Sequence, residues 1–260
     1  MTNRFLLTPM SLDQPTPELR RLRREGWSIN EPDPVRDAAL QRRIAAVNEP
    51  IARFTEEAAR AGDRPVCLTG DCCAAIGALT GLQRAGVEPT LLWLDAHGDF
   101  NTPATTPSGY LGGMPLAMLT GRGDLEILDA LRAHIIDDDA VVLYDARDLD
   151  PLEREALAAS RVTHVTSIDA LDSFDFGRGP VHVHLDPDVL NPLDAPAMAY
   201  PAPGGPDLAV LSRVLSRLAG RGVAITSVTL TTWAVDRDGS GGTEAAVWQL
   251  LESLLGERIR

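Results

Sequence analysis

Short apolar runs rich in β-branched residues alternate along this chain with longer segments whose apolar residues recur at helical spacing. The short runs predict strands at residues 4–7, 65–69, 90–95, 140–144, 162–165, 181–186 and 224–230. The longer segments predict helices at residues 38–61, 73–85, 125–133, 152–159, 207–219 and 243–255. This alternation predicts an α/β protein whose mostly parallel sheet is covered by helices on both faces.

Composition narrows the class of protein. With 260 residues, 44% hydrophobic and 23% charged, the chain fits one globular domain over residues 1–260. A net charge of −13 argues against nucleic acid and anionic membranes as partners, because both attract basic surfaces. No apolar run approaches the roughly 20 residues that a membrane span needs.

Two further features favour the cytoplasm. The first residues lack the basic start and apolar run of a secretory signal. The three cysteines, Cys67, Cys72 and Cys73, form no disulfide framework, and reduced thiols are typical of the cytosol.

Polar side chains follow the apolar strands directly. Asp95, His97 and Asp99 occupy alternate positions at the end of one strand, and Asp186 and Asp188 follow another. Ligands of such sheets bind at the carboxyl ends of the strands, where these side chains are expected to converge. One acidic pair alone is usually a solvated strand end, but two clusters after strongly apolar strands favour a metal site.

The donor types indicate which metal. Four carboxylates with an imidazole suit Mn²⁺ or another borderline divalent ion. Because a carboxylate can bridge two ions, the set is able to hold one ion, or two ions about 3.5 Å apart that share an activated water.

Three ordered motifs carry a resemblance to a known family. They read Trp93-Leu-Asp-Ala-His-Gly-Asp-Phe-Asn101, His184-Leu-Asp-Pro-Asp-Val-Leu-Asn-Pro192 with Pro203-Gly-Gly205 after it, and Thr69-Gly-Asp-Cys-Cys73. This set resembles the arginase, agmatinase and formimidoylglutamase family of ureohydrolases, from about residue 65 to the C-terminus. The resemblance implies a three-layer α/β/α sandwich, often in trimers or hexamers, that hydrolyses a guanidino or amidino carbon and releases urea or an analogue.

The resemblance also implies roles for individual residues. Asp95 and Asp186 would bridge two manganese ions, Cys72 and Asp99 would complete one site, and His97 and Asp188 the other. Asp99 is also a candidate catalytic residue.

Substrate-side residues carry over as well. Asn101 and Ser108 match residues that hold the α-carboxylate in arginases, and Asp150 matches the acid that orders the α-amino group. Each is also a common turn former, but the three in register favour an amino-acid substrate.

Three positions depart from the family pattern. Cys72 replaces a histidine ligand, and a thiolate suits Mn²⁺ less well than imidazole; its other interpretation is a small buried residue at a helix start. Gly112 stands where arginases carry a proton-shuttling histidine, and this loop resembles the N-hydroxyarginine hydrolases of antibiotic biosynthesis. Thr232 stands where a glutamate pairs with the guanidinium, so a cationic substrate would be poorly compensated.

His184 is the remaining candidate catalytic residue. It alternates with valines on a predicted strand and lies two positions before Asp186, so it is placed to reach the metals. The competing interpretation is a hydrogen-bonded strand residue without a role in catalysis.

These observations predict a manganese-dependent hydrolase acting on a modified guanidino or amidino amino acid, such as N-hydroxyarginine, in specialised metabolism. The alternatives are an ordinary arginase or agmatinase, and a family member that binds metal or ligand without turnover. A redox or sensing protein that uses the Cys72–Cys73 pair is disfavoured, because adjacent cysteines form only a strained disulfide.

Overall fold

A computed structural model describes residues 1–32, 38–231 and 233–259. The strands are β1 (Asn3–Thr8), β2 (Met10–Ser11), β3 (Gln14–Pro15), β4 (Ser28–Ile29), β5 (Arg64–Thr69), β6 (Thr90–His97), β7 (Val141–Asp148), β8 (Thr163–Val165), β9 (Pro180–Leu185) and β10 (Ala224–Thr231). The α-helices are α1 (Leu40–Arg60), α2 (Ala74–Arg84), α3 (Pro115–Leu119), α4 (Glu126–Leu131), α5 (Pro151–Ala158), α6 (Ile168–Ser173), α7 (Leu208–Gly220) and α8 (Gly242–Leu255).

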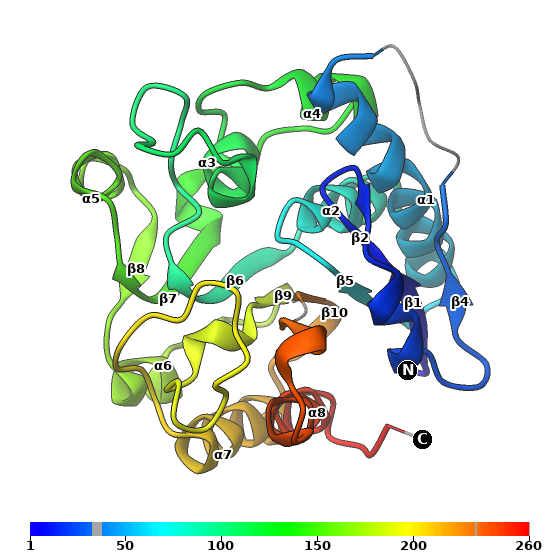
Figure 1. Ribbon diagram of the computed structural model, residues 1–260, viewed down its shortest axis with the longest axis vertical. Helices are drawn as coiled ribbons and strands as arrows, with labels where there is room; N and C mark the ends of the chain where they lie inside the picture. Colours follow the sequence, from blue (N-terminus) through cyan, green and yellow to red (C-terminus); the bar gives the residue numbers. More distant parts are fainter. Residues whose placement is uncertain (33–37, 232, 260) are drawn as a thin grey trace.

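The strands build one large sheet of eight, in the order β4-β1-β5-β10-β9-β6-β7-β8, and every pair in it is parallel. Helices α1 to α5 lie along one face, and α6, α7 and α8 along the other (Figure 1). The predicted α/β class, with its parallel sheet and two helical layers, is therefore confirmed.

Successive side chains of a strand point to opposite faces of the sheet, so each strand contributes to the hydrophobic core on both faces. On β6, Leu92 and Leu94 pack in the core under α7 and α8, whereas Leu91 and Trp93 pack in the core under α1 and α2. Both faces of the strand are apolar because both are covered by helices. Trp93 shares its face with His184 of β9, since the two residues are register partners and their rings stack with centroids 3.7 Å apart.

The strand order positions the site. β9 lies between β10 and β6, and β5 lies on the far side of β10, so the loops after β5, β6 and β9 open at the same edge of the sheet. β6 continues to His97 instead of ending at Asp95, and β7 continues to Asp148 instead of Tyr144. None of the helices in the described ranges is both long and apolar enough to cross a membrane.

Candidate metal centre

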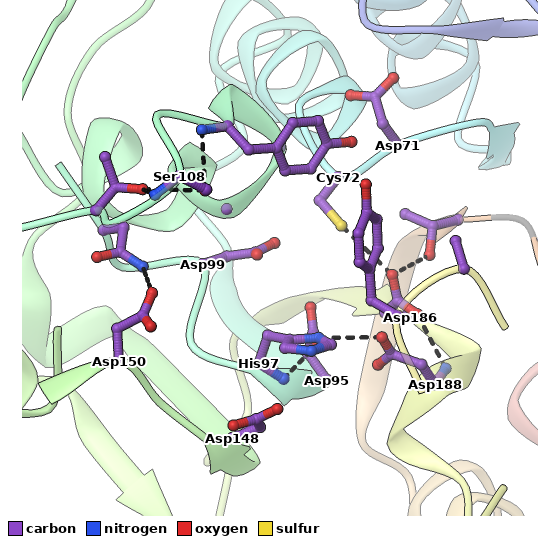
Figure 2. A pocket seen from close by; sticks show the side chains of 18 of the residues that line it. Asp71, Cys72, Asp95, His97, Asp99, Ser108, Asp148, Asp150, Asp186 and Asp188 are labelled. Carbon is purple, nitrogen blue, oxygen red and sulfur yellow. Dashed lines mark hydrogen bonds and ion pairs between the residues drawn. The ribbon is translucent and has the colours of Figure 1, made fainter. Parts of the chain in front are cut away.

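The loop after β5 presents Cys72. Asp71, buried in this loop, accepts hydrogen bonds from the amides of Leu12 (2.6 Å) and Cys73 (2.9 Å). Burial raises the pKa of Asp71 to about 6. Asp71 therefore fixes the turn against the N-terminal segment, and Cys72 projects from it toward the acidic side chains (Figure 2).

The end of β6 supplies three donors. The His97 amide donates to Asp95 Oδ1 at 2.7 Å, and the Trp93 indole donates to Asp95 Oδ2 at 3.2 Å. Pairing with β7 shifts register between Asp95 and His97, and Asp99 has a φ of 47°, a left-handed conformation that aspartate tolerates better than most residues. The chain thus turns within the motif, so that all three side chains face the cavity (Figure 2).

The end of β9 supplies the other two carboxylates. Asp186 Oδ1 accepts from the Asp188 amide at 2.9 Å, and its Oδ2 accepts from the Thr231 hydroxyl at 2.7 Å and the Cys72 thiol at 3.4 Å. Asp188 Oδ1 in turn accepts from the Ala96 amide at 3.2 Å. This hydrogen bond from the Ala96 amide links the acidic motif after β9 to the motif at the end of β6.

Two sets of donor atoms converge. One donor atom each from Cys72, Asp95, Asp99 and His184 lie within 4.8 Å of one another, and so do donor atoms from Asp95, His97 and Asp188. Asp95 belongs to both sets, which is the arrangement a bridging carboxylate requires. Asp186 is outside both sets and contacts Cys72 instead.

The cluster is strongly acidic and buried. Burial, together with the neighbouring carboxylate Asp188, raises the pKa of Asp186 to about 7. Burial and Asp95 raise the pKa of Asp188 to about 6. Burial and the neighbouring carboxylate of Asp95 also raise the pKa of Asp99 well above its usual range. Burial opposes protonation of His97, but hydrogen bonds to Asp188 and Asp95 outweigh it and raise its pKa to about 12.

These features fit divalent cations. Carboxylates crowded in a buried site repel one another unless positive charge compensates them. Asp99 Oδ2 and His184 Nε2 are buried and have no hydrogen-bond partner among the described residues. Burial lowers the pKa of His184 well below its usual range, so its imidazole is neutral, the form that binds metal.

A cavity of about 500 Å³ opens above the acidic cluster, and the predicted substrate residues Asn101, Ser108 and Asp150 line it. Asn101 Nδ2 donates to Asp150 Oδ2 at 2.9 Å (Figure 2). Ser108 Oγ accepts from the Tyr110 amide at 3.2 Å. The structure brings these three residues to one cavity, whereas Thr232 lies outside the described residues.

Tyr110 was not singled out from the sequence, because its importance depends on the missing side chain at Gly112. A Cβ built on Gly112 would lie 2.3 Å from Tyr110 Cε1 and 2.6 Å from its hydroxyl. The phenol ring therefore occupies the space that a side chain at position 112 would enter. It also lies near the ring of Tyr200, with centroids 5.7 Å apart at the cavity.

Two charged residues that the sequence prediction did not single out, the buried Glu153 and the partly buried Arg147, hold the loops together. Glu153 accepts from the amides of Phe100 (2.9 Å) and Asp150 (3.1 Å), which joins the β6 loop to the start of α5. Arg147 pairs with Asp145 and donates to five backbone carbonyls, those of Asp188, Val189, Leu190, Ala202 and Pro203. Phe100 and the five carbonyls are distant in sequence, so only the fold reveals these contacts, whereas the capping box of Asp150 and Glu153 spans three residues and can be read from the sequence.

The Arg147 side chain also explains the glycine pair of the second motif. Gly205 has a φ of +88°, and a Cβ there would lie 2.6 Å from the Val189 carbonyl and 2.9 Å from the Arg147 guanidinium. A side chain at this position would push the loop off Arg147.

The chain is similar in sequence and in structure to known proteins. The model of the Arginase family matches residues 34–256. The arginase of Brucella melitensis is 33% identical over an alignment of 232 positions that covers 83% of this chain and 74% of that protein. Among solved structures, the arginase of Bacillus subtilis aligns with a TM-score of 0.80 at 26% identity, and that of Bacillus cereus with a TM-score of 0.81 at 25% identity; each alignment covers 100% of both chains. The matched range includes every loop that supplies the metal centre.

Proposed function

Because the chain belongs to the arginase family of ureohydrolases, we propose that it hydrolyses a linear C–N bond of a guanidino or amidino amino acid with the help of manganese. We further propose that the substrate is a modified compound such as N-hydroxyarginine, used in specialised metabolism. The observation that carries this refinement is Tyr110, whose ring occupies the space above Gly112 where arginases carry a histidine.

The metal part of the proposal rests on the two convergent donor sets. Asp95, His97 and Asp188 would hold one ion, and Cys72 and Asp99 with Asp95 the other. Asp186 would join both after its carboxylate turns from Thr231, which now donates to it at 2.7 Å. The bound ions would supply a water molecule of lowered pKa and an electrostatic anchor for the substrate.

The amino-acid part rests on the cavity wall. Asn101 and Asp150 are hydrogen-bonded to each other and lie beside Ser108. A carboxylate acceptor next to amide and hydroxyl donors matches the α-amino and α-carboxylate groups of an amino acid. These residues would orient the substrate so that its guanidino carbon lies at the acidic cluster.

The preference for a hydroxylated guanidine follows from the charge of the substrate. The resemblance aligns Thr232 with a glutamate that pairs with a guanidinium, and a buried unpaired cation is costly. N-hydroxylation makes the guanidine less basic, so it binds nearer neutrality and depends less on a carboxylate at position 232. The product would be hydroxyurea.

Ordinary arginase activity is the second candidate, and the names of the similar proteins from Brucella melitensis and Bacillus subtilis favour it. A screen separates the two. Metal-free protein reloaded with Mn²⁺ is given arginine, N-hydroxyarginine and agmatine, and urea and hydroxyurea are measured. Hydroxyurea from N-hydroxyarginine only in the presence of metal supports the proposal. No product from any compound contradicts it and favours a family member that binds without turnover.

A further inference from the structure

His184 lies in the middle of the sheet with one ring nitrogen engaged and the other free. Its side chain is fully buried, and Nδ1 lies 2.9 Å from the Thr229 hydroxyl oxygen. Its ring stacks on Trp93 with centroids 3.7 Å apart and planes 24° apart. Nε2 is buried and has no hydrogen-bond partner in the described part of the chain. The imidazole is therefore fixed in orientation while its second nitrogen is left unsatisfied.

That free nitrogen belongs to the first convergent set. Donor atoms of Cys72, Asp95, Asp99 and His184 lie within 4.8 Å of one another. Nδ1 is already used by Thr229, so Nε2 is the donor that remains for this set. Asp99, another member of this set, also has a buried oxygen, Oδ2, without a hydrogen-bond partner among the described residues.

A chain of hydrogen bonds gives Nε2 a lone pair. The Thr229 hydroxyl lies 2.9 Å from His184 Nδ1 and 3.1 Å from His182 Nε2, and His182 Nδ1 lies 2.7 Å from the Ser227 hydroxyl. A single direction satisfies the chain: His184 Nδ1–H donates to Thr229, Thr229 donates to His182, and His182 donates to Ser227. The opposite direction would leave an N–H of His184 without an acceptor. Metal-binding histidines characteristically donate their other N–H in this way.

We propose that His184 Nε2 is a metal ligand, so that the Cys72 site binds its ion through a thiolate, an imidazole and the carboxylates of Asp95 and Asp99. The inference rests on the proposed metal centre. Because sulfur and nitrogen donors favour Co²⁺ and Zn²⁺ over Mn²⁺, this site would select a softer ion than the site of His97 and Asp188.

His182 provides a matched control. It lies on the same face of β9, is equally buried, and differs in having both ring nitrogens hydrogen-bonded. It is not part of either donor set. His184→Gln and His182→Gln therefore make the same change at neighbouring buried positions, only one of which faces the cluster.

The test is a titration of metal-free protein with Co²⁺ in the absence of oxygen. A near-ultraviolet thiolate-to-cobalt band, absent in Cys72→Ser, reports the ion beside Cys72, and the visible bands report its coordination. We expect His184→Gln to weaken this binding by at least about 10-fold, since even neighbours of metal ligands typically cost that much, and to shift the visible bands. His182→Gln should keep the wild-type visible bands, because His182 is in neither donor set and contacts His184 only through the Thr229 hydroxyl.

The outcomes distinguish the role of His184 as a ligand from the existence of the metal centre itself. If the thiolate band forms in His184→Gln with unchanged affinity and spectrum, His184 is no ligand, although the metal centre stands. Weaker binding with an unchanged spectrum also rules out a ligand, because only a positioning effect would remain. If wild-type protein takes up no Co²⁺ and no Mn²⁺, the proposed metal centre itself fails.

A measurement on wild-type protein covers the case in which His184→Gln does not fold. In protein labelled with nitrogen-15 histidine and loaded with Co²⁺, a bound His184 would give a strongly shifted N–H proton from Nδ1. Full burial and the Thr229 bond should protect this proton from exchange. Absence of a shifted histidine N–H, while the thiolate band is present, would overturn the assignment.

Discussion

The ring of Tyr110 lies over Gly112 so closely that a Cβ at position 112 would be 2.3 Å from the ring. The phenol of Tyr110 can lie at the cavity in this position only because residue 112 has no side chain. A side chain could be introduced at position 112 only by displacing Tyr110.

We predict that Gly112→Ala lowers kcat/KM for the substrate by about 100-fold, because misplacing a cavity group by about 1 Å has effects of that size. The effect should nearly vanish when the change is made in a Tyr110→Ala background, since the clash is then absent. Gly113→Ala is the control, because a Cβ there has no neighbour within 4 Å. Equal losses with and without Tyr110 would show that the ring is not the cause.

Asp95 should be required for both ions and Asp188 for one. Asp95→Asn should leave the dialysed protein almost free of manganese, whereas Asp188→Asn should spare the ion beside Cys72. Metal-free Asp95→Asn should also melt at a higher temperature than metal-free wild type, because one member of a repelling buried cluster is gone. Full manganese content in Asp95→Asn contradicts the bridging role; metal analysis and thermal unfolding provide the readouts.

Cys72→His should increase manganese binding at the weaker site, because imidazole suits Mn²⁺ better than a thiolate does. The measurement is the number of ions retained after dialysis against a low concentration of Mn²⁺. Cys73→Ser is the control: Cys73 is buried, donates to the Leu111 carbonyl at 3.5 Å and belongs to neither donor set. Two firmly retained manganese ions in wild-type protein would contradict the expectation that the Cys72 site binds Mn²⁺ weakly.

The metal-free protein should lose stability as pH rises. Burial and like charge raise the folded-state pKa of Asp186 to about 7 and of Asp188 to about 6, above the roughly 4 of an unfolded aspartate. The folded state therefore binds more protons, and stability falls between about pH 4 and pH 7. His97, whose folded pKa is raised to about 12, adds stability that is fully present below about pH 6.5 and is lost progressively as the pH rises from there toward about 12, so the signs agree.

Bound manganese should reverse this trend, since the ion replaces the protons and its stabilising effect grows with pH. Melting temperatures at pH 5, 6 and 7, with chelator and with saturating Mn²⁺, measure both slopes. An Asp186→Asn/Asp188→Asn protein should show a flatter metal-free slope. A metal-free melting temperature that rises from pH 5 to pH 7 is incompatible with this account.

The sequence predicted the layers and the location of the site because both depend on local patterns. Apolar runs such as residues 181–185 form β9, and the aspartates after β6 and β9 lie at the same edge of the sheet because parallel strands share a direction. The short strands β2 to β4 and the helices α3 and α6 were missed, since the strands span two residues each, the helices span five and six residues, and all show little periodicity of their own.

Residues whose roles come from distant contacts could not be predicted. Arg147 contacts carbonyls more than forty residues away, and the unsatisfied nitrogen of His184 becomes evident only when Thr229 is seen to occupy the other one. The expected trimer or hexamer, the cytoplasmic location and the role of Thr232 stay predictions.

The specificity constants for N-hydroxyarginine and arginine, measured side by side on manganese-loaded protein, test the central claim most directly. The account predicts a preference of at least about 100-fold for N-hydroxyarginine, because a guanidinium that lacks a buried carboxylate partner at position 232 loses about 3 kcal/mol or more, and a less basic hydroxyguanidine avoids this loss. Arginine hydrolysed as well as N-hydroxyarginine, or better, would contradict it and identify an ordinary arginase.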